Sequence, residues 1–234
     1  MSGLSFKKRL IKAARLFVLQ RLKFGIVDYR NINMVNGPGL LDDVIQVYKE
    51  DRFLQGIEEL YNIHNIVRAT GRLEGAIAEV GVYKGGTAKL IALGKGAREL
   101  HLFDSFEGMI KVSGSTDRHA KGDFGDSRIE DVKRYLSGFE GIYFHKGWFP
   151  ETASPVLEMK ISFSLVHLDV DLYQSTKDAL ELFSPRMVPG GVILSHDYNS
   201  VSCPGVKKAF DEFSSGTDTT VFELGGTSQC MVVF

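Results

Sequence analysis

The most constraining feature of this 234-residue chain is the segment AIAEVGVYKGGTAKL at positions 76–90, in which an apolar run enters a glycine-rich turn and then a helical pattern. Glycine tolerates the backbone angles of a sharp turn and lets the chain approach a ligand closely. Unpaired N–H groups at the start of a helix favour polar or anionic ligand groups. The segment therefore predicts a strand, a turn and a helix that together bind a nucleotide-like cofactor.

The spacing of the glycines narrows the choice of cofactor. A dinucleotide pyrophosphate is typically bound by G-x-G-x-x-G, whereas here Glu79 is followed by Gly81, Gly85 and Gly86 in the pattern E-x-G-x-x-x-G-G. An acidic residue beside the turn can accept hydrogen bonds from the ammonium group of an amino acid. S-adenosylmethionine, which carries an amino acid and no pyrophosphate, is the cofactor that this pattern favours. The structural alternative is a turn whose glycines serve tight packing alone.

The composition indicates one globular domain with an N-terminal extension. Its 28 Lys and Arg residues nearly balance 29 Asp and Glu residues, so no nucleic-acid surface is predicted. Two cysteines, Cys203 and Cys230, are too few to define a disulfide framework, and no apolar run is long enough to cross a bilayer. We therefore expect a cytoplasmic protein in a reducing compartment.

Residues 1–36 predict a helical arm, and residues 37–234 predict the main domain. Between positions 4 and 24, apolar residues such as Leu10, Phe17 and Leu22 recur with helical periodicity among lysines and arginines. A basic amphipathic helix can bind an anionic membrane surface, but an arm that packs on the protein or joins two copies is the favoured interpretation. A homodimer is the assembly that such an arm would support.

Strands and helices alternate along the predicted domain, which favours an α/β fold with a doubly wound parallel sheet. The expected strands cover positions 76–81, 99–104, 141–145, 163–169 and 191–195. The expected helices cover positions 41–70, 87–94, 127–136, 176–183 and 205–214, with Ser127 as the N-cap of the third.

Two further segments depart from this alternation. Residues 106–126 are rich in Gly, Ser, Asp and Lys and predict a long loop over the active site. Residues 219–224 and 229–234 flank Gly225-Gly226 and predict an antiparallel hairpin added to the sheet.

Acidic side chains follow the predicted strands at their carboxyl ends, where an open parallel sheet binds its ligands. Asp104 ends the second strand, and its two oxygens could accept hydrogen bonds from the two hydroxyls of a ribose. Asp169 and Asp171 follow the fourth strand, and His196-Asp197 follows the fifth. Like charges so close need a cation or hydrogen-bond donors, and oxygen ligands favour Mg²⁺. Without a metal, His196 could be a general base or a structural imidazole.

Four motifs in this order resemble those of the macrocin O-methyltransferases: EVGVYKGG at 79–86, FDSFEG at 103–108, KGWFPET at 146–152 and LDVDLYQST at 168–176. The resemblance covers position 41 to the C-terminus. It implies a Rossmann-like class I methyltransferase fold, S-adenosylmethionine as methyl donor, and Mg²⁺-dependent methylation. The implied acceptor is a hydroxyl of a sugar or another polyhydroxylated small molecule.

The resemblance also implies roles for individual residues. The turn that holds the methionine part of the cofactor would comprise Glu79, Gly81, Tyr83, Gly85, Gly86 and Thr87. Asp104 and Ser105 would hold the ribose, and Gly147 with Trp148 would lie near the adenine.

The implied metal and catalytic site departs from the family pattern at one position. Asp169 is the leading ligand and base, but His196 stands before Asp197 where the family usually has a first aspartate. The candidate ligands are therefore Asp169, His196 and Asp197, with Asp169 and His196 as the candidate catalytic residues. Imidazole is a softer ligand than Mg²⁺ prefers, so Mn²⁺ or a metal-free His196 base is an alternative.

Two other function classes remain open at the level of the sequence. A scaffold protein that had lost its metal site would bind the cofactor without transferring a methyl group. A nucleotide-linked oxidoreductase would share the topology, although the glycine spacing disfavours it.

Overall fold

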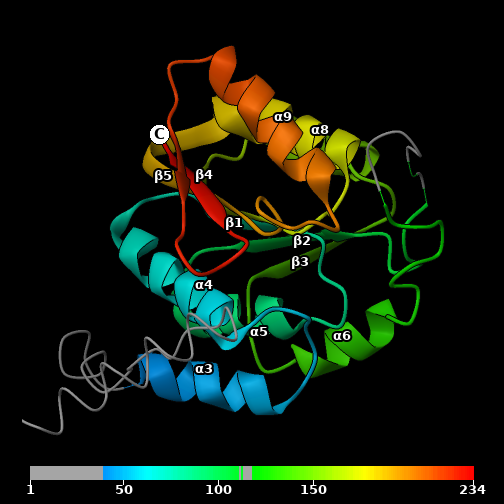
Figure 1. Cartoon of the computed structure of the whole chain (residues 1–234). Coiled ribbons are helices and arrows are strands. Elements are labelled where there is room, and N and C mark those ends of the chain that lie inside the picture. Colours follow the sequence, from blue (N-terminus) through cyan, green and yellow to red (C-terminus); the bar gives the residue numbers. More distant parts are fainter. Residues whose placement is uncertain (1–38, 111, 113–117) are drawn as a thin grey trace, which may run out of the picture. The chain divides into compact units, whose positions relative to one another are not determined.

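The computed structural model describes residues 39–110, 112 and 118–234. The predicted arm over 1–36, with its membrane and dimer interpretations, lies outside the described residues. Residues Asp42–Phe234 form one compact unit. The unit is built on a seven-stranded sheet in the order β3-β2-β1-β4-β5-β7-β6 (Figure 1).

Five strands of the sheet are parallel, as the alternating pattern predicts. They are β1 Ala76–Val80, β2 Leu100–Asp104, β3 Ile142–Lys146, β4 Phe163–Leu168 and β5 Met187–Ser195. β1 pairs with β2 on one side and with β4 on the other. The strand order therefore reverses between β1 and β4, and their carboxyl ends form the switch point at which such sheets bind ligands.

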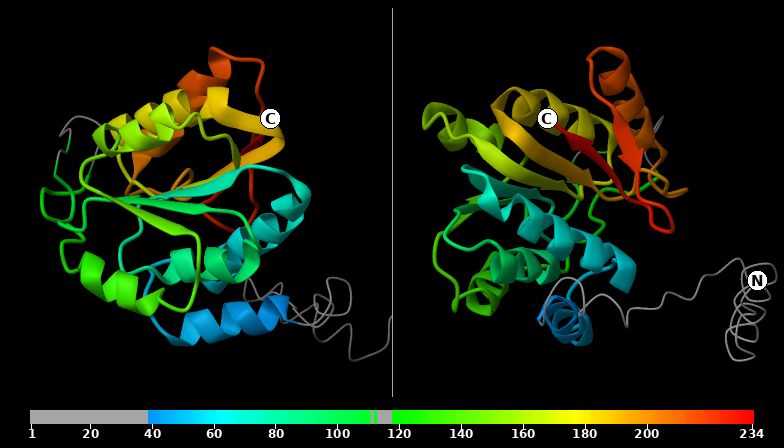
Figure 2. Two further views of the ribbon diagram at one scale, coloured as in Figure 1. Left: turned by 180° about the vertical axis from the view of Figure 1, so that it is seen from behind. Right: turned by 90° about the vertical axis from the view of Figure 1, so that its left-hand side faces the viewer.

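Helices cover both faces of the sheet, which confirms the doubly wound α/β fold (Figure 2). They are α3 Leu40–Lys49, α4 Ile57–Ala69, α5 Gly86–Gly94, α6 Ile129–Tyr135, α7 Ser154–Glu158, α8 Tyr173–Phe183 and α9 Pro204–Ser215. None of the helices in the described part is both long and apolar enough to span a bilayer.

Alternate residues of the buried strands supply two apolar cores, one on each face of the sheet. Ile77 of β1 packs in the core that includes Leu60 of α4 and Leu90 of α5. Its neighbour Ala78 packs in the opposite core, which includes Leu180 of α8. Burial on both faces explains why β1 and β4 are mostly apolar along their whole length, and why their polar residues Glu79, Ser164 and His167 are buried.

The predicted C-terminal hairpin is confirmed. Its strands are β6 Val221–Glu223 and β7 Cys230–Val233, which pair antiparallel to each other. β7 also pairs antiparallel to β5, so the hairpin extends the parallel sheet by two strands.

The prediction of one helix over 41–70 is wrong, because α3 and α4 are separate. Asp51 adopts a left-handed backbone with φ of 53°, a conformation that an α-helix cannot continue. Gly56 is the N-cap of α4, and the carboxylate of Glu59 accepts its N–H at 2.8 Å. The break releases residues 50–56 from helical structure and brings several of them to the site described below.

Smaller differences concern the ends of elements. α6 begins at Ile129 with Arg128 as its N-cap residue, and no side chain caps it, so Ser127 is not the N-cap. α7 was absent from the predicted elements, and α8 begins at Tyr173, three positions before the predicted start. β1 ends at Val80, which places Glu79 inside the strand rather than at its end.

The turn after β1 is held tightly against the end of β4. The N–H of Asp169 donates to the carbonyl oxygen of Val80 at 2.9 Å. Gly81 has φ of 88°, and a Cβ at this position would lie 1.9 Å from the carbonyl oxygen of Asp169. Glycine is therefore required at position 81 by backbone packing.

Substitution of Gly81 by Ala should lower the free energy of unfolding by about 3 kcal/mol or more, because the backbone of Asp169 must move. Urea denaturation followed by circular dichroism measures this change. Gly138→Ala is the control, since no atom lies within 4 Å of a Cβ at that position; it should change stability by less than about 0.5 kcal/mol. Equal stabilities of the two variants would contradict the packing argument.

Candidate active site

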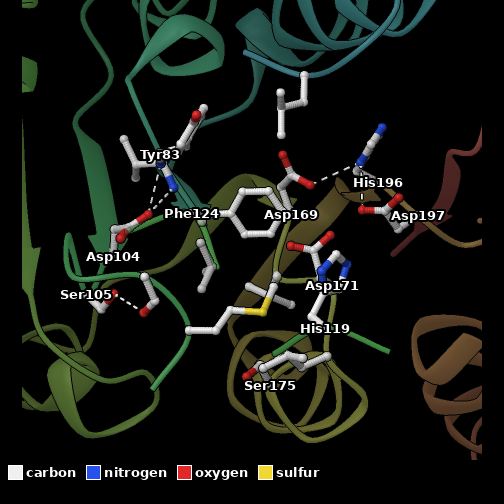
Figure 3. Close-up of a pocket in the computed structure, with 18 of the residues that line it drawn as sticks. Tyr83, Asp104, Ser105, His119, Phe124, Asp169, Asp171, Ser175, His196 and Asp197 are labelled. Carbon is white, nitrogen blue, oxygen red and sulfur yellow. Dashed lines mark hydrogen bonds and ion pairs between the residues drawn. The ribbon is translucent and has the colours of Figure 1, made fainter. Parts of the chain in front are cut away.

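A cavity of about 350 Å³ lies at the carboxyl ends of the central strands. The turn after β1, the ends of β2 and β4 and the segment after β5 form its walls, and residues such as Phe53 and Gln55 enter from the break between α3 and α4. Figure 3 shows Asp104 on one side of the cavity and Asp169, His196 and Asp197 on the other. The two groups of acids predicted from the sequence therefore face the same space.

Asp104 organises the glycine-rich turn. Its Oδ2 accepts the N–H groups of Val82 at 2.7 Å and Tyr83 at 2.9 Å, and its Oδ1 accepts the N–H of Phe106 at 2.6 Å (Figure 3). A carboxylate has about four acceptor positions, so one position on Oδ1 is left for a ligand hydroxyl. The sequence predicted a carboxylate open at both oxygens, whereas Oδ2 is already engaged by the turn.

Several predicted cofactor residues line this cavity. They are Gly81, Tyr83, Thr87, Asp104, Ser105, Gly147 and Trp148. Tyr83 has a left-handed backbone with φ of 50°, and its hydroxyl donates to Asp126 at 3.2 Å. The Ser105 hydroxyl donates to the carbonyl of Gly108 at 2.7 Å and accepts the N–H of Glu107, so this serine shapes the start of the loop.

Gly85 and Gly86 do not line the cavity and instead serve packing. A Cβ on Gly85 would lie 2.8 Å from the side chain of Val132 in α6. A Cβ on Gly86 would lie 2.7 Å from the ring of Phe53 and 2.8 Å from the carbonyl oxygen of Arg52. Close packing therefore accounts for these two glycines, which is the alternative role stated above for the glycines of this turn.

Glu79 lies beneath the cavity rather than in its wall. Its side chain is fully buried, and its Oε1 is 3.0 Å from Nδ1 of His167, its partner on β4. Burial raises the pKa of Glu79, although the hydrogen bond and charge of His167 oppose the shift. Glu79 Oε2 has no hydrogen-bond partner among the described residues.

The acids on the other side of the cavity surround His196. Its Nδ1 lies 2.8 Å from Oδ2 of Asp197 and 3.1 Å from Oδ1 of Asp169, and its Nε2 lies 3.2 Å from Oε2 of Glu59. Burial alone would lower the pKa of His196, but the charge of Asp169 and the hydrogen bonds with the three acids raise it well above its usual range. The backbone of Asp197 is left-handed with φ of 64°, a strain typical of functional sites.

Both carboxylate oxygens of Glu59 contact neighbouring groups. Ser228 donates to Oε1 through its N–H at 2.9 Å and its hydroxyl at 2.7 Å, while Gly56 and His196 contact Oε2. Burial works to raise the pKa of Glu59, but these contacts outweigh it and lower the pKa to about 2.

A second group of side chains ties the predicted loop to the cavity wall. Sγ of Cys203 lies 3.5 Å from Nε2 of His119 and 3.4 Å from Oδ1 of Asp171. Burial and the charge of Asp169 raise the pKa of Asp171 well above its usual range. Gly108, Met109, His119 and Phe124, from the described parts of residues 106–126, line the cavity.

Sequence reasoning missed Gln55, Glu59, His119 and Cys203. Gln55 donates from Nε2 to Oδ2 of Asp169, so both oxygens of that carboxylate are held by neighbouring side chains. Gln55 and Glu59 fell within a helix predicted to be continuous, and His119 fell within a polar loop. Nothing in their local pattern distinguishes them from surface residues.

Asp169, His196 and Asp197 offer one nitrogen and two carboxylate donors whose ligand atoms lie within 4.8 Å of one another. Nδ1 is the imidazole atom that faces both aspartates, and Nε2 is occupied by Glu59. This donor set fits a divalent cation, because a histidine ligand normally has its other nitrogen bound to a carboxylate or carbonyl.

The sequence model of the family described as macrocin O-methyltransferase (TylF) matches residues 53–222. An 8-demethyl-8-(2,3-dimethoxy-alpha-L-rhamnosyl)-tetracenomycin-C 4'-O-methyltransferase of Streptomyces olivaceus is 31% identical over 192 residues, covering 74% of this chain and 72% of its own length. A demethyldecarbamoylnovobiocin O-methyltransferase of Streptomyces niveus is 29% identical over 181 residues, covering 70% of this chain and 68% of its own length.

Solved structures agree with these relatives. The O-methyltransferase NovP is 27% identical, with a TM-score of 0.65, and the match covers 75% of this chain and 79% of NovP. The calicheamicin methyltransferase CalS11 has a TM-score of 0.68 over 100% of this chain and 95% of its own. At 17% identity, CalS11 supports the fold alone.

Glu59→Gln should destabilise the protein at pH 6 by at most about 3 kcal/mol, because the lowered pKa of Glu59 reflects stabilisation of its charged form. Since the folded pKa lies below the unfolded value, this stabilisation is present above about pH 4.5 and is lost as the pH falls toward about 2. Urea denaturation at about pH 6, 4.5 and 3.5, which enters the upper part of that window, should show the gap to wild type narrowing. Glu58→Gln, in the same turn of α4, is the control, and a gap independent of pH would contradict the assignment.

Proposed function

The chain belongs to the macrocin O-methyltransferase family of class I methyltransferases, and from this premise we propose that it methylates a hydroxyl of a sugar or other polyhydroxylated small molecule with S-adenosylmethionine as donor. The family match and the curated relatives make it an O-methyltransferase. The observation that carries the finer proposal is the single cavity that Asp104 and Asp169 face from different walls. A methyltransferase needs such a space, because donor and acceptor must meet in line.

We assign the donor to the side of the cavity formed by the turn after β1. S-adenosylmethionine supplies a methyl group that is already activated by its sulfonium charge. The free acceptor position on Oδ1 of Asp104 suits one ribose hydroxyl, and Trp148 supplies an aromatic surface near the end of β3. Thr87, at the start of α5, lines the part of the cavity next to the turn. Glu79 would act from beneath the cavity, through the buried oxygen that lacks a partner among the described residues.

Asp169 is the proposed base on the acceptor side. Its oxygens are fixed by Gln55 and His196, so the carboxylate points in one direction before the acceptor arrives. The acceptor oxygen would give up its proton to Asp169 as it takes the methyl group. Placement of the two reacting atoms supplies most of the acceleration, and proton removal by a positioned base adds a factor of roughly 10² to 10⁴.

His196 is proposed to act through Asp169 rather than as the base itself. Three carboxylates stabilise its protonated form, and a protonated imidazole cannot accept a proton. Asp169, His196 and Asp197 would also hold the divalent metal, Mg²⁺ or Mn²⁺, which would replace the proton on Nδ1 of His196. A metal at this position would lower the pKa of an acceptor hydroxyl bound to it.

The acceptor class rests on the relatives and on the cavity wall. The relative from Streptomyces olivaceus is named for a rhamnosyl-tetracenomycin, and the relative from Streptomyces niveus for a novobiocin precursor. In this chain, Phe53, Leu54, Met109 and Phe124 give part of the cavity an apolar lining. We therefore propose that the acceptor is a sugar hydroxyl on a molecule that also carries an apolar group.

Calorimetric titration with S-adenosylmethionine should show micromolar binding by the wild type. Asp104→Ala should weaken it at least tenfold, about 1.4 kcal/mol, because both the ribose contact and the support of the turn are lost. Asp218→Ala removes an exposed aspartate and should bind like the wild type. Absence of binding in the wild type would remove the donor assignment.

Asp169→Asn should lower turnover by roughly 100-fold or more while donor binding is retained, because the amide cannot take the hydroxyl proton. The assay follows transfer of a labelled methyl group to a panel of rhamnosides and glycosylated aromatic compounds. Asp218→Ala again serves as the control. Wild-type turnover by Asp169→Asn would show that Asp169 is not the base.

A further inference from the structure

We propose that Glu59 is a positioning residue that turns His196 into a nitrogen ligand for a divalent cation, and that the resulting site selects Mn²⁺ over Mg²⁺. The proposal deepens the function proposed above, since it concerns the acid cluster of the same cavity. It is carried by the contacts of His196 and Glu59, and the histidine at position 196 departs from the family pattern.

The contact between His196 and Glu59 determines which imidazole nitrogen carries hydrogen. Glu59 Oε2 faces Nε2 at 3.2 Å. The same carboxylate already accepts hydrogen bonds from Gly56 and from two donors of Ser228. An ionised carboxylate has about four acceptor positions and no hydrogen to donate, so Glu59, with three positions occupied by these donors, can only accept from the imidazole. Nε2 therefore carries hydrogen, and Nδ1 is the nitrogen that would present its lone pair to a metal ion once its own proton is released.

Nδ1 of His196 points toward two carboxylates. It lies 3.1 Å from Asp169 Oδ1 and 2.8 Å from Asp197 Oδ2 (Figure 3). Adjacent ligands around an octahedral ion with metal–ligand distances of about 2.1 Å lie about 3 Å apart. The two distances from Nδ1 are thus those of neighbouring ligands on one small ion, and all three ligand atoms lie within 4.8 Å of one another. Carboxylate, histidine and metal in this sequence form an arrangement that fixes the tautomer and raises the basicity of the ligand nitrogen.

Neighbouring side chains hold the proposed oxygen ligands in place. Gln55 donates to the second oxygen of Asp169, so rotation of this carboxylate is restrained from the side opposite His196. The side chains of Glu59, Asp169, His196 and Asp197 are each at most 17% exposed. Gln55 and Glu59 come from the break between α3 and α4 and from the first turn of α4. The N-terminal end of α4 therefore holds the cluster on one side.

The choice of ion follows from the donor set. Mg²⁺ prefers oxygen ligands and loses its waters reluctantly. Imidazole suits first-row transition ions, for which Mn²⁺ is the member closest to Mg²⁺ in its preference for carboxylates. One nitrogen and two carboxylates therefore favour Mn²⁺, whereas the family's first aspartate at position 196 would give an all-oxygen set.

The test measures metal binding to the full-length protein, stripped with a chelator, in the absence of donor and acceptor. Free Mn²⁺ is counted by electron paramagnetic resonance, Mg²⁺ is added in competition, and pulsed resonance reports nitrogen bound to Mn²⁺. We expect one Mn²⁺ per chain, competition only by at least a tenfold excess of Mg²⁺, and an imidazole nitrogen signal. No Mn²⁺ binding, no nitrogen signal, or equal affinity for Mg²⁺ would overturn the proposal.

Variants separate the roles of Glu59 and His196. Glu59→Gln should weaken Mn²⁺ binding by roughly tenfold or more, while Glu58→Gln in the same helical turn should bind like the wild type. His196→Asp should lose the nitrogen signal and bind Mg²⁺ about as well as Mn²⁺. If Glu59→Gln does not fold, Glu59→Asp withdraws the carboxylate but keeps its charge, and it should weaken Mn²⁺ binding as well. Wild-type affinity in the folded Glu59 variant would show that this residue does not position His196.

Failure of this proposal and failure of the proposed function are distinguishable. Metal binding is measured without methyl transfer, and donor binding is measured without metal. A protein that binds S-adenosylmethionine but neither Mn²⁺ nor Mg²⁺ would keep the transferase assignment and lose the metal site.

Discussion

The close junction between β1 and β4 is the constraint on which the active site depends. Because the N–H of Asp169 donates to Val80, and because only a glycine fits opposite the Asp169 carbonyl, the glycine-rich turn and the backbone of Asp169 form one closely packed unit. Movement of either would disturb the other. Placement of reacting atoms can contribute much of the acceleration of a two-substrate reaction, and in the proposed mechanism main-chain contacts of the central sheet would secure it. The surrounding side chains then adjust charge and orientation.

Much of this unit could be predicted from the sequence, because it is encoded locally. Apolar runs identify the parallel strands, and Asp104, Asp169 and Asp197 follow from the rule that polar residues at the carboxyl ends of such strands share one edge. The family resemblance was confirmed by the match over residues 53–222. What failed depends on tertiary contacts. The helical periodicity of residues 41–70 hides the turn at Asp51, and the role of Glu59 exists only because β5 and the hairpin bring His196 and Ser228 to α4. Likewise, no local signal shows that Glu79 is paired with His167 across two strands.

The site gathers acids and supplies them with different partners. Asp104 is held by backbone N–H groups, Asp169 by Gln55 and His196, and Glu59 by Ser228 and Gly56. Asp171 differs from these three acids, because burial and the charge of Asp169 raise its pKa and favour its neutral form. Clustered carboxylates are therefore stabilised individually, by hydrogen bonds or by protonation. Gln55 and His196 meanwhile set the direction of the Asp169 carboxylate.

The contact of His119 with Cys203, which in turn contacts Asp171, has a consequence for the width of the cavity. His119 is linked through Cys203 to the wall at Asp171, and Asp126 is linked to the glycine-rich turn through Lys84 and Tyr83. Separation of these contacts would widen the cavity on this side, so they oppose its opening. In many enzymes such opening and the departure of product, rather than bond making, limit the rate. The strength of a few weak surface contacts would then set how fast the enzyme works.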